Sequence, residues 1–312
     1  MIDRGRLPQL SGATFITDGG METTLIFDDG IDLPHFAAFG LLDDPTGIEA
    51  LRGYYASYLE IAAQHGVGIV LDTPTWRANP DWGELLGYSA EALADVNRRG
   101  VALLEELRST TGDGVSQVII SGCIGPRGDG YRVDSKMTSE EAQRYHEAQI
   151  ATFSDTAADL VSALTLTYAD EAVGIARAAE AAGMPGVISF TVETDGRLPS
   201  GQSLREAIDE VDARTDGSVA YFMINCAHPT HFAHVLEEDG GWLDRIRGLR
   251  ANASEKSHAE LDEAEELDPG DPAALARHYR ELQARLPNLS VVGGCCGTSQ
   301  RHVAEICAAV TT

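Results

Sequence analysis

The stretch Val67-Gly-Ile-Val-Leu-Asp72 is the clearest indication of the fold in this 312-residue chain. Every position before the final aspartate is apolar, which is typical of a parallel strand that is buried on both faces. Seven other short segments have strand-like patterns, and amphipathic helical patterns separate them. The predicted strands cover residues 14–17, 68–72, 117–122, 159–163, 187–192, 219–225, 246–250 and 289–293.

Helical patterns follow these strands along the whole chain. They cover residues 46–64, 89–109, 139–157, 169–182, 203–211, 271–286 and 299–309. Eight βα units in a chain of this length predict a closed (β/α)₈ TIM barrel, for which about 250 residues is typical. An open, doubly wound parallel sheet is the alternative, but no glycine-rich dinucleotide fingerprint follows the first strand. No change in composition marks a second domain, so we predict a single domain over residues 1–312.

The charge of the chain excludes several classes of partner. It has 23 Lys and Arg against 49 Asp and Glu, which gives a formal net charge of −26. Such an acidic surface repels phosphate backbones and anionic lipids, so we expect no nucleic-acid and no membrane partner. The apolar runs are too short for a membrane span, and the start of the chain does not resemble a signal peptide. We therefore predict a cytoplasmic protein that acts on small molecules, and self-association stays open.

Five cysteines are the residues that point most directly to chemistry. An odd number in a cytoplasmic chain indicates free thiols or metal ligands rather than disulfides. Cys226 follows the sixth predicted strand, and Cys295 and Cys296 follow the eighth, where glycines allow the backbone to turn. In a barrel these strand ends meet at one mouth, and three thiolates there suit Zn²⁺. The alternative for each cysteine alone is burial as a small side chain, which we expect for Cys123 and Cys307.

Three motifs together resemble the zinc-dependent homocysteine S-methyltransferases. They are Asp18-Gly-Gly-Met-Glu-Thr23, Asn225-Cys226 and Gly293-Gly-Cys-Cys-Gly-Thr298, and the resemblance runs from the first strand to the last. It implies a (β/α)₈ barrel in which the three strand-end cysteines hold zinc and act in catalysis. It also implies methyl transfer to a thiol, homocysteine first, which gives methionine. The donor expected is a sulfonium, S-methylmethionine or S-adenosylmethionine, with betaine as a further option.

The chemistry of the residues agrees with this resemblance. A free thiol has a pKa of about 8.5 and is a poor nucleophile at neutral pH, whereas coordination to Zn²⁺ deprotonates it. A methyl group on a sulfonium carries positive charge, which an acidic mouth attracts. A zinc-bound substrate thiolate attacking such a methyl group is therefore the predicted reaction.

The resemblance also implies residues that contact the substrate. Asp18 matches the carboxylate that lies near the amino group of the acceptor, and we predict it to be catalytic as well. Glu22, Thr75, Trp76 and Asn225 are the other predicted substrate contacts, Trp76 as a ring that faces a methylated cation. For Asp18 the alternative is a turn residue before two glycines, and for the loop residues it is ordinary packing.

Two departures from the family pattern concern the recognition of the acceptor. Leu164 stands where the family carries a glutamate that helps to hold the substrate amine, and Ala251-Asn-Ala-Ser-Glu255 replaces Pro-Asn-Ser-Gly-Glu. We therefore expect weaker discrimination for homocysteine unless Asp18 alone, or Glu193 after the fifth strand, holds the amine. The alternatives are a different thiol or selenol acceptor, or a barrel that binds zinc and thiols without turnover.

Overall fold

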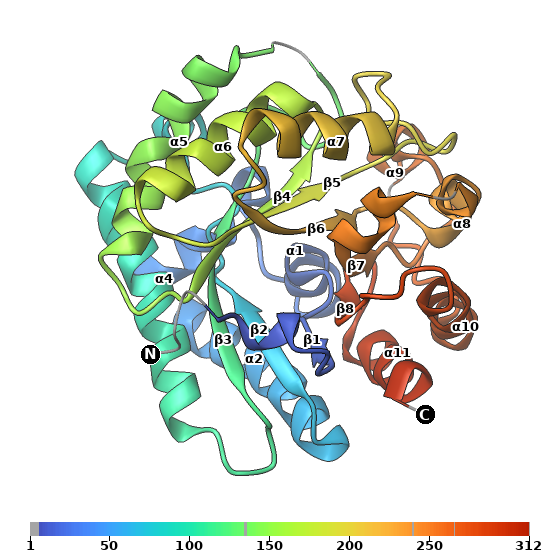
Figure 1. The fold of residues 1–312 in the computed structure, drawn as a ribbon. Coiled ribbons are helices and arrows are strands. Elements are labelled where there is room, and N and C mark those ends of the chain that lie inside the picture. Colours follow the sequence, from blue (N-terminus) through green and yellow to red (C-terminus); the bar gives the residue numbers. More distant parts are fainter. Residues whose placement is uncertain (1–5, 134–135, 239, 265, 312) are drawn as a thin grey trace.

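Eight parallel strands close into a barrel in the computed structural model, which describes residues 6–133, 136–238, 240–264 and 266–311. Each strand pairs with the next, and β8 pairs with β1 (Figure 1). The predicted (β/α)₈ barrel is confirmed, and every predicted strand overlaps an observed one. The strands are β1 (Phe15–Ile16), β2 (Gly68–Asp72), β3 (Val118–Ile124), β4 (Leu160–Leu166), β5 (Gly186–Phe190), β6 (Val219–Asn225), β7 (Ile246–Ala251) and β8 (Val291–Gly294).

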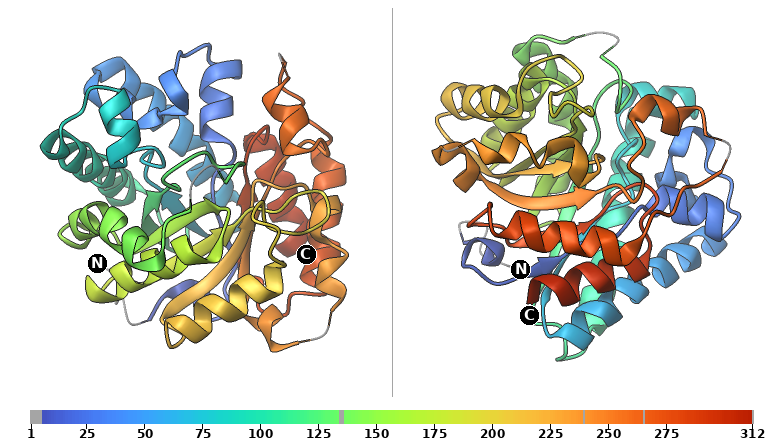
Figure 2. Two further views of the ribbon diagram at one scale, coloured as in Figure 1. Left: turned by 90° about the horizontal axis from the view of Figure 1, so that it is seen from above. Right: turned by 90° about the vertical axis from the view of Figure 1, so that its right-hand side faces the viewer.

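Helices surround the barrel, as the views in Figures 1 and 2 show. The long ones are α2 (Pro45–His65), α4 (Ala90–Thr110), α5 (Ser139–Ser154), α6 (Ala169–Ala181), α7 (Leu204–Arg214), α10 (Pro272–Gln283) and α11 (Gln300–Thr311). Short helices lie in the connections: α1 (Met21–Thr23), α3 (Pro80–Leu85), α8 (Pro229–Phe232) and α9 (His258–Asp262). None of the helices in the described ranges has both the length and the apolar character needed to cross a bilayer.

Two separate apolar clusters stabilise this arrangement. The larger one lies between the strands and the helices and includes Cys307, as expected for that cysteine. The smaller one fills the barrel interior, with Phe15, Val70 and Ile119 among its members. Gly68 makes room for the Phe15 ring, because a Cβ at this position would lie 2.2 Å from the ring. The filled interior leaves the mouth at the C-terminal ends of the strands as the place for a site.

Candidate active site

Three cysteine sulfurs lie together at the C-terminal ends of β6 and β8. The Sγ atoms of Cys226, Cys295 and Cys296 are all within 4.8 Å of one another. In the described part of the chain, no other group of His, Cys, Asp and Glu side chains has a geometry that could hold a metal ion. The structure therefore brings together the three residues that the sequence selects, and thiolate sulfur in this number is a ligand set that zinc accepts.

Two of these cysteines are bonded to each other. Cys226 and Cys295 form a disulfide with their Cα atoms 5.4 Å apart, and Cys296 is a free thiol 3.9 Å from the Cys226 sulfur. The sequence predicts free thiols or metal ligands here, and the convergence that suits a metal also brings these two sulfurs within bonding reach. A metal requires both as thiolates. The disulfide and metal binding are thus alternative states of the same residues.

A tight turn after β8 presents the last two cysteines. Thr298 donates hydrogen bonds to the Cys295 carbonyl from its backbone N–H (3.0 Å) and its hydroxyl (2.7 Å). Gly297 has a φ of +77°, which glycine adopts without strain. A Cβ at Gly20 would lie 2.6 Å from the Cys295 carbonyl oxygen. The glycines of both terminal motifs therefore allow the first and last strand ends to approach closely.

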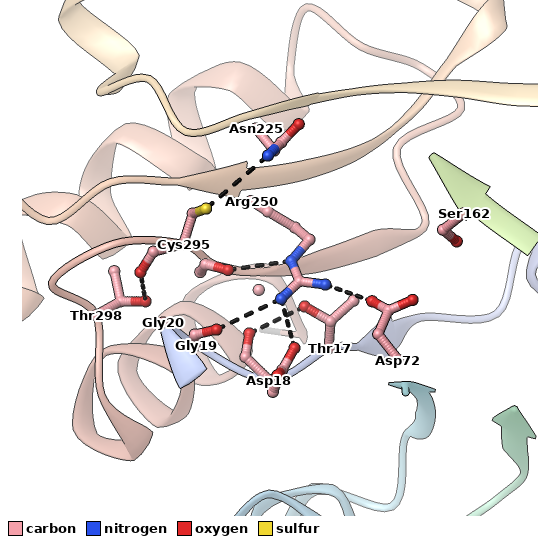
Figure 3. A network of polar contacts seen from close by, with 12 residues as sticks. Thr17, Asp18, Gly19, Gly20, Asp72, Ser162, Asn225, Arg250, Cys295 and Thr298 are labelled. Atoms are coloured by element: carbon pink, nitrogen blue, oxygen red, sulfur yellow. Dashed lines mark hydrogen bonds and ion pairs between the residues drawn. The ribbon is translucent and has the colours of Figure 1, made fainter. Parts of the chain in front are cut away.

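Asn225 connects the sulfur cluster to the neighbouring strands. Its Oδ1 accepts hydrogen bonds from the Thr165 N–H (2.9 Å) and the Ser189 hydroxyl (2.6 Å). Its amide nitrogen donates to the Thr165 hydroxyl (2.8 Å) and points toward the Cys295 sulfur 3.9 Å away (Figure 3). Thr165 and Cys226 both have positive φ values, +65° and +53°, at this junction. Asn225 lines the cavity, but its polar atoms serve mainly to hold β4, β5 and the sulfurs in place.

A buried arginine lies on the strand between the two that carry the cysteines, and the sequence analysis missed it. Arg250 on β7 forms ion pairs with Asp18 (2.5 Å) and with Asp72, and its Nε donates to the Gly294 carbonyl (3.1 Å) (Figure 3). Burial raises the pKa of Asp18 to about 6, against the opposing effects of Arg250 and of a hydrogen bond from Tyr54. The two arginines of the β7 stretch Ile-Arg-Gly-Leu-Arg-Ala were the available signal, since a charge at a barrel strand end needs a partner.

The sulfurs and the charged cluster line one cavity of about 270 Å³. Of the predicted contacts, Asp18, Glu22, Trp76 and Asn225 line it. Thr75 does not: it is fully buried behind the wall and donates its hydroxyl to the Cys123 carbonyl (2.8 Å). Among the other lining residues are Met21, Thr73, Cys123, Tyr131 and Leu164. A space of this size accommodates small molecules only.

The guanidinium of Arg77 stacks on the ring of Trp76 at the cavity. The Arg77 guanidinium lies 4.1 Å from the Trp76 ring centroid and 3.9 Å from that of Trp82. The indole N–H of Trp76 donates to the Leu164 carbonyl (3.1 Å). The protein's own arginine thus occupies the cation position that was expected for a methylated ligand on Trp76.

Tyr131 closes the loop after β3 over the sulfur cluster. Its hydroxyl lies 3.4 Å from the Cys296 sulfur, and its ring stacks on His258 at 4.1 Å between centroids. His258 in turn donates from Nε2 to the Cys226 carbonyl (2.7 Å). Burial raises the pKa of both Tyr131 and Cys296. The sequence places this loop at the mouth, but the contact with Cys296 joins residues 165 positions apart and has no local signal.

Comparison with known proteins shows which family the chain belongs to. A family model described as homocysteine S-methyltransferase matches residues 15–310. The chain belongs to the homocysteine S-methyltransferase family. It is therefore a thiol methyltransferase, and the alternative of a barrel without turnover is set aside.

Its relatives are distant in sequence. Homocysteine S-methyltransferase 4 of Zea mays is 24% identical, over 96% of this chain and 90% of that protein. Methionine synthase of Mycobacterium tuberculosis is 26% identical over 99% of this chain, which corresponds to 26% of that longer protein. The homocysteine methyltransferase MmuM from Escherichia coli has the same fold. Its oxidized form matches with a TM-score of 0.73 at 20% identity, covering 97% of this chain and 99% of that one. Its metallated form gives 0.70 at 20% identity, over 95% and 96%.

Proposed function

We propose that this enzyme transfers a methyl group from a sulfonium donor, S-methylmethionine or S-adenosylmethionine, to the thiol of homocysteine, giving methionine. The observation that carries the proposal is the set of three cysteine sulfurs within 4.8 Å of one another on the wall of a small cavity. Family membership supports a thiol as the acceptor. The sulfonium is proposed because its positive charge suits a cavity rich in carboxylates and thiolates.

Zinc held by Cys226, Cys295 and Cys296 is part of this proposal. When bound, Zn²⁺ keeps a thiol in its thiolate form at neutral pH and so makes it nucleophilic. The residues fit such an ion, since zinc accepts sulfur ligands and three protein ligands leave one place free. The Cys226–Cys295 disulfide must be reduced first, which a reducing cytoplasm provides.

The chain's own residues position the reactants around these sulfurs. The Asn225 amide points toward the Cys295 sulfur, and the Tyr131 hydroxyl lies next to the Cys296 sulfur. The Asp18–Arg250 pair fixes the charged part of the cavity wall. A small cavity holds acceptor and donor close together, which favours transfer of the methyl group in line with the attacking sulfur.

A second candidate keeps the chemistry and changes the acceptor to a different thiol or a selenol. Leu164 favours it, because this cavity-lining side chain cannot pair with an ammonium group. The presence of Arg250 beside Asp18 favours it as well, because the carboxylate expected near the amine already has a cation.

Product detection by mass spectrometry tests these candidates. Reduced, zinc-loaded enzyme is incubated with each of several thiols and selenols against S-methylmethionine, S-adenosylmethionine and betaine. We expect methionine from homocysteine with a sulfonium donor. Methylation of another acceptor with homocysteine left unchanged would support the second candidate and contradict the first.

A further inference from the structure

Glu22 is a carboxylate on the cavity wall that no other described residue pairs with, although its own backbone N–H donates to it. Within the described ranges, no other residue forms an ion pair or a hydrogen bond with its side chain. The four other acids on this wall pair with an arginine or accept backbone N–H groups; they are Asp18, Asp72, Asp129 and Asp262. A bound cation would therefore meet Glu22 as the available charge.

Asp18 is poorly suited to bind a substrate ammonium in this chain. One of its oxygens accepts from Arg250 at 2.5 Å and the other from the Tyr54 hydroxyl at 3.1 Å. The side chains of Asp18 and Arg250 are only 3% and 6% exposed. A guanidinium thus occupies the place beside Asp18, and Leu164 supplies no second carboxylate.

Glu22 lies on the wall of the same small cavity as the sulfur cluster. Cys226, Cys295 and Cys296 line this cavity together with Glu22, so a molecule of the size of the acceptor that reaches the sulfurs is also within reach of Glu22. The charge of Arg77 acts on Glu22, but the Arg77 guanidinium donates to the Gly128 carbonyl (3.0 Å) and lies over two tryptophan rings. Burial raises the pKa of Glu22 to about 7, which a cation bound beside it would reverse.

We propose that Glu22 binds the ammonium group of an amino-acid thiol acceptor, in place of Asp18 and of the carboxylate that is absent at position 164. This inference rests on the proposed function, because it concerns the acceptor of that reaction. It assigns the recognition of the amine to the short helix α1, which follows the first strand, rather than to the fourth strand. The acceptor class that fits is a thiol with an amino group a few bonds from sulfur.

Calorimetric titration without methyl donor tests this assignment. Zinc-loaded wild-type and Glu22→Gln enzymes are titrated with homocysteine and with 4-mercaptobutanoate, which has the same thiol and carboxylate but no amine. We expect Glu22→Gln to weaken homocysteine binding by about ten- to a hundredfold, since a hydrogen bond to a charged group is lost. Binding of 4-mercaptobutanoate should change by less than about threefold, because it has no group for Glu22 to bind.

Glu193→Gln tests the competing assignment of the amine to the carboxylate that follows β5. Glu193 also follows a strand end, but it contacts His258 at 3.3 Å and lies outside the cavity lining, so both affinities should stay at wild-type values. The inference is overturned if wild-type enzyme binds the two thiols equally, if Glu22→Gln weakens both alike, or if Glu193→Gln produces the loss specific to homocysteine. Methylation of homocysteine by the wild type decides the proposed function separately, since these titrations need no turnover.

Discussion

The two walls of the cavity differ in how far the sequence reveals them. The sulfur wall comes from β6 and β8, where an Asn-Cys pair and a glycine-rich Cys-Cys turn are visible as local motifs. The charged wall is the Asp18–Arg250–Asp72 cluster, in which residues as far apart as positions 18 and 250 meet. A site built on local turns can therefore be predicted from the sequence. Ion pairs between residues far apart in the chain can be identified only once the fold is known.

The two walls should also differ in what they contribute. The sulfurs would hold the proposed metal, whereas the two apolar clusters stabilise the fold. The buried arginine compensates two carboxylates, so its loss should act on stability. The following predictions test this division, from the largest expected effect to the smallest.

Removing a sulfur should abolish function and leave the fold. We expect Cys296→Ser to lose bound zinc and to lower kcat/KM by at least about a thousandfold, because metal activation of the nucleophile contributes several kcal/mol. Metal analysis and methyl-transfer assays measure both effects. Cys123→Ser is the control, since Cys123 lines the cavity but lies outside the sulfur cluster. Zinc retained at wild-type affinity in Cys296→Ser would contradict the ligand assignment.

Removing the buried arginine should act mainly on stability. Arg250→Met leaves Asp18 and Asp72 without their cation, and we expect the free energy of unfolding to fall by about 3–5 kcal/mol. Arg52→Met is a matched control, because Arg52 also pairs with two carboxylates, Glu49 and Glu106, but at the surface. The control should change stability by about 1 kcal/mol or less. Equal losses in urea denaturation of the two variants would show that Arg250 has no special role.

The stability of metal-free, reduced protein should depend on the protonation of Glu22. The pKa of this group rises from 4.5 to about 7 on folding. Below pH 4.5 it is protonated in both states. Between pH 4.5 and 7 the unfolded chain releases the proton first, so the free energy of unfolding falls as the pH rises. Glu22→Gln removes this loss, and its advantage over wild type should grow to about 1–3 kcal/mol at pH 7.5. An advantage that does not vary with pH would refute the assignment.

A carboxylate restored at position 164 should sharpen acceptor selectivity. Leu164 lines the cavity at the place where the family resemblance implies a glutamate. We expect Leu164→Glu to raise the ratio of kcat/KM for homocysteine to that for 4-mercaptobutanoate by about three- to tenfold, because burial of the new charge at this buried position offsets part of the gain from pairing with the ammonium group. Leu164→Gln has a similar shape without the charge and is the control. The same ratio in both variants would show that charge at this position does not select the amine.

The fold was largely predictable because its signals are local. The β2 and β6 boundaries agree at both ends with the apolar runs at 68–72 and 219–225. The end of β4 extends to Leu166, three residues beyond the predicted strand, and Thr165 near this end has a positive φ that sequence patterns do not show.

The site was predictable only in part, and for a related reason. Cys226, Cys295 and Cys296 belong to motifs with a fixed spacing, so their convergence followed from the barrel. Arg250 and Tyr131 act through partners more than 150 positions away, which no local pattern specifies. Thr75 has a residue type suited to binding, but its hydroxyl serves the Cys123 carbonyl instead.

X-ray absorption at the zinc edge tests the central claim, that three cysteine thiolates of this chain hold zinc and leave one place for the acceptor sulfur. Spectra of reduced, zinc-loaded enzyme are compared before and after addition of homocysteine. The account predicts three sulfur ligands in the free enzyme and four in the complex. An unchanged ligand shell in an enzyme that turns over would contradict it.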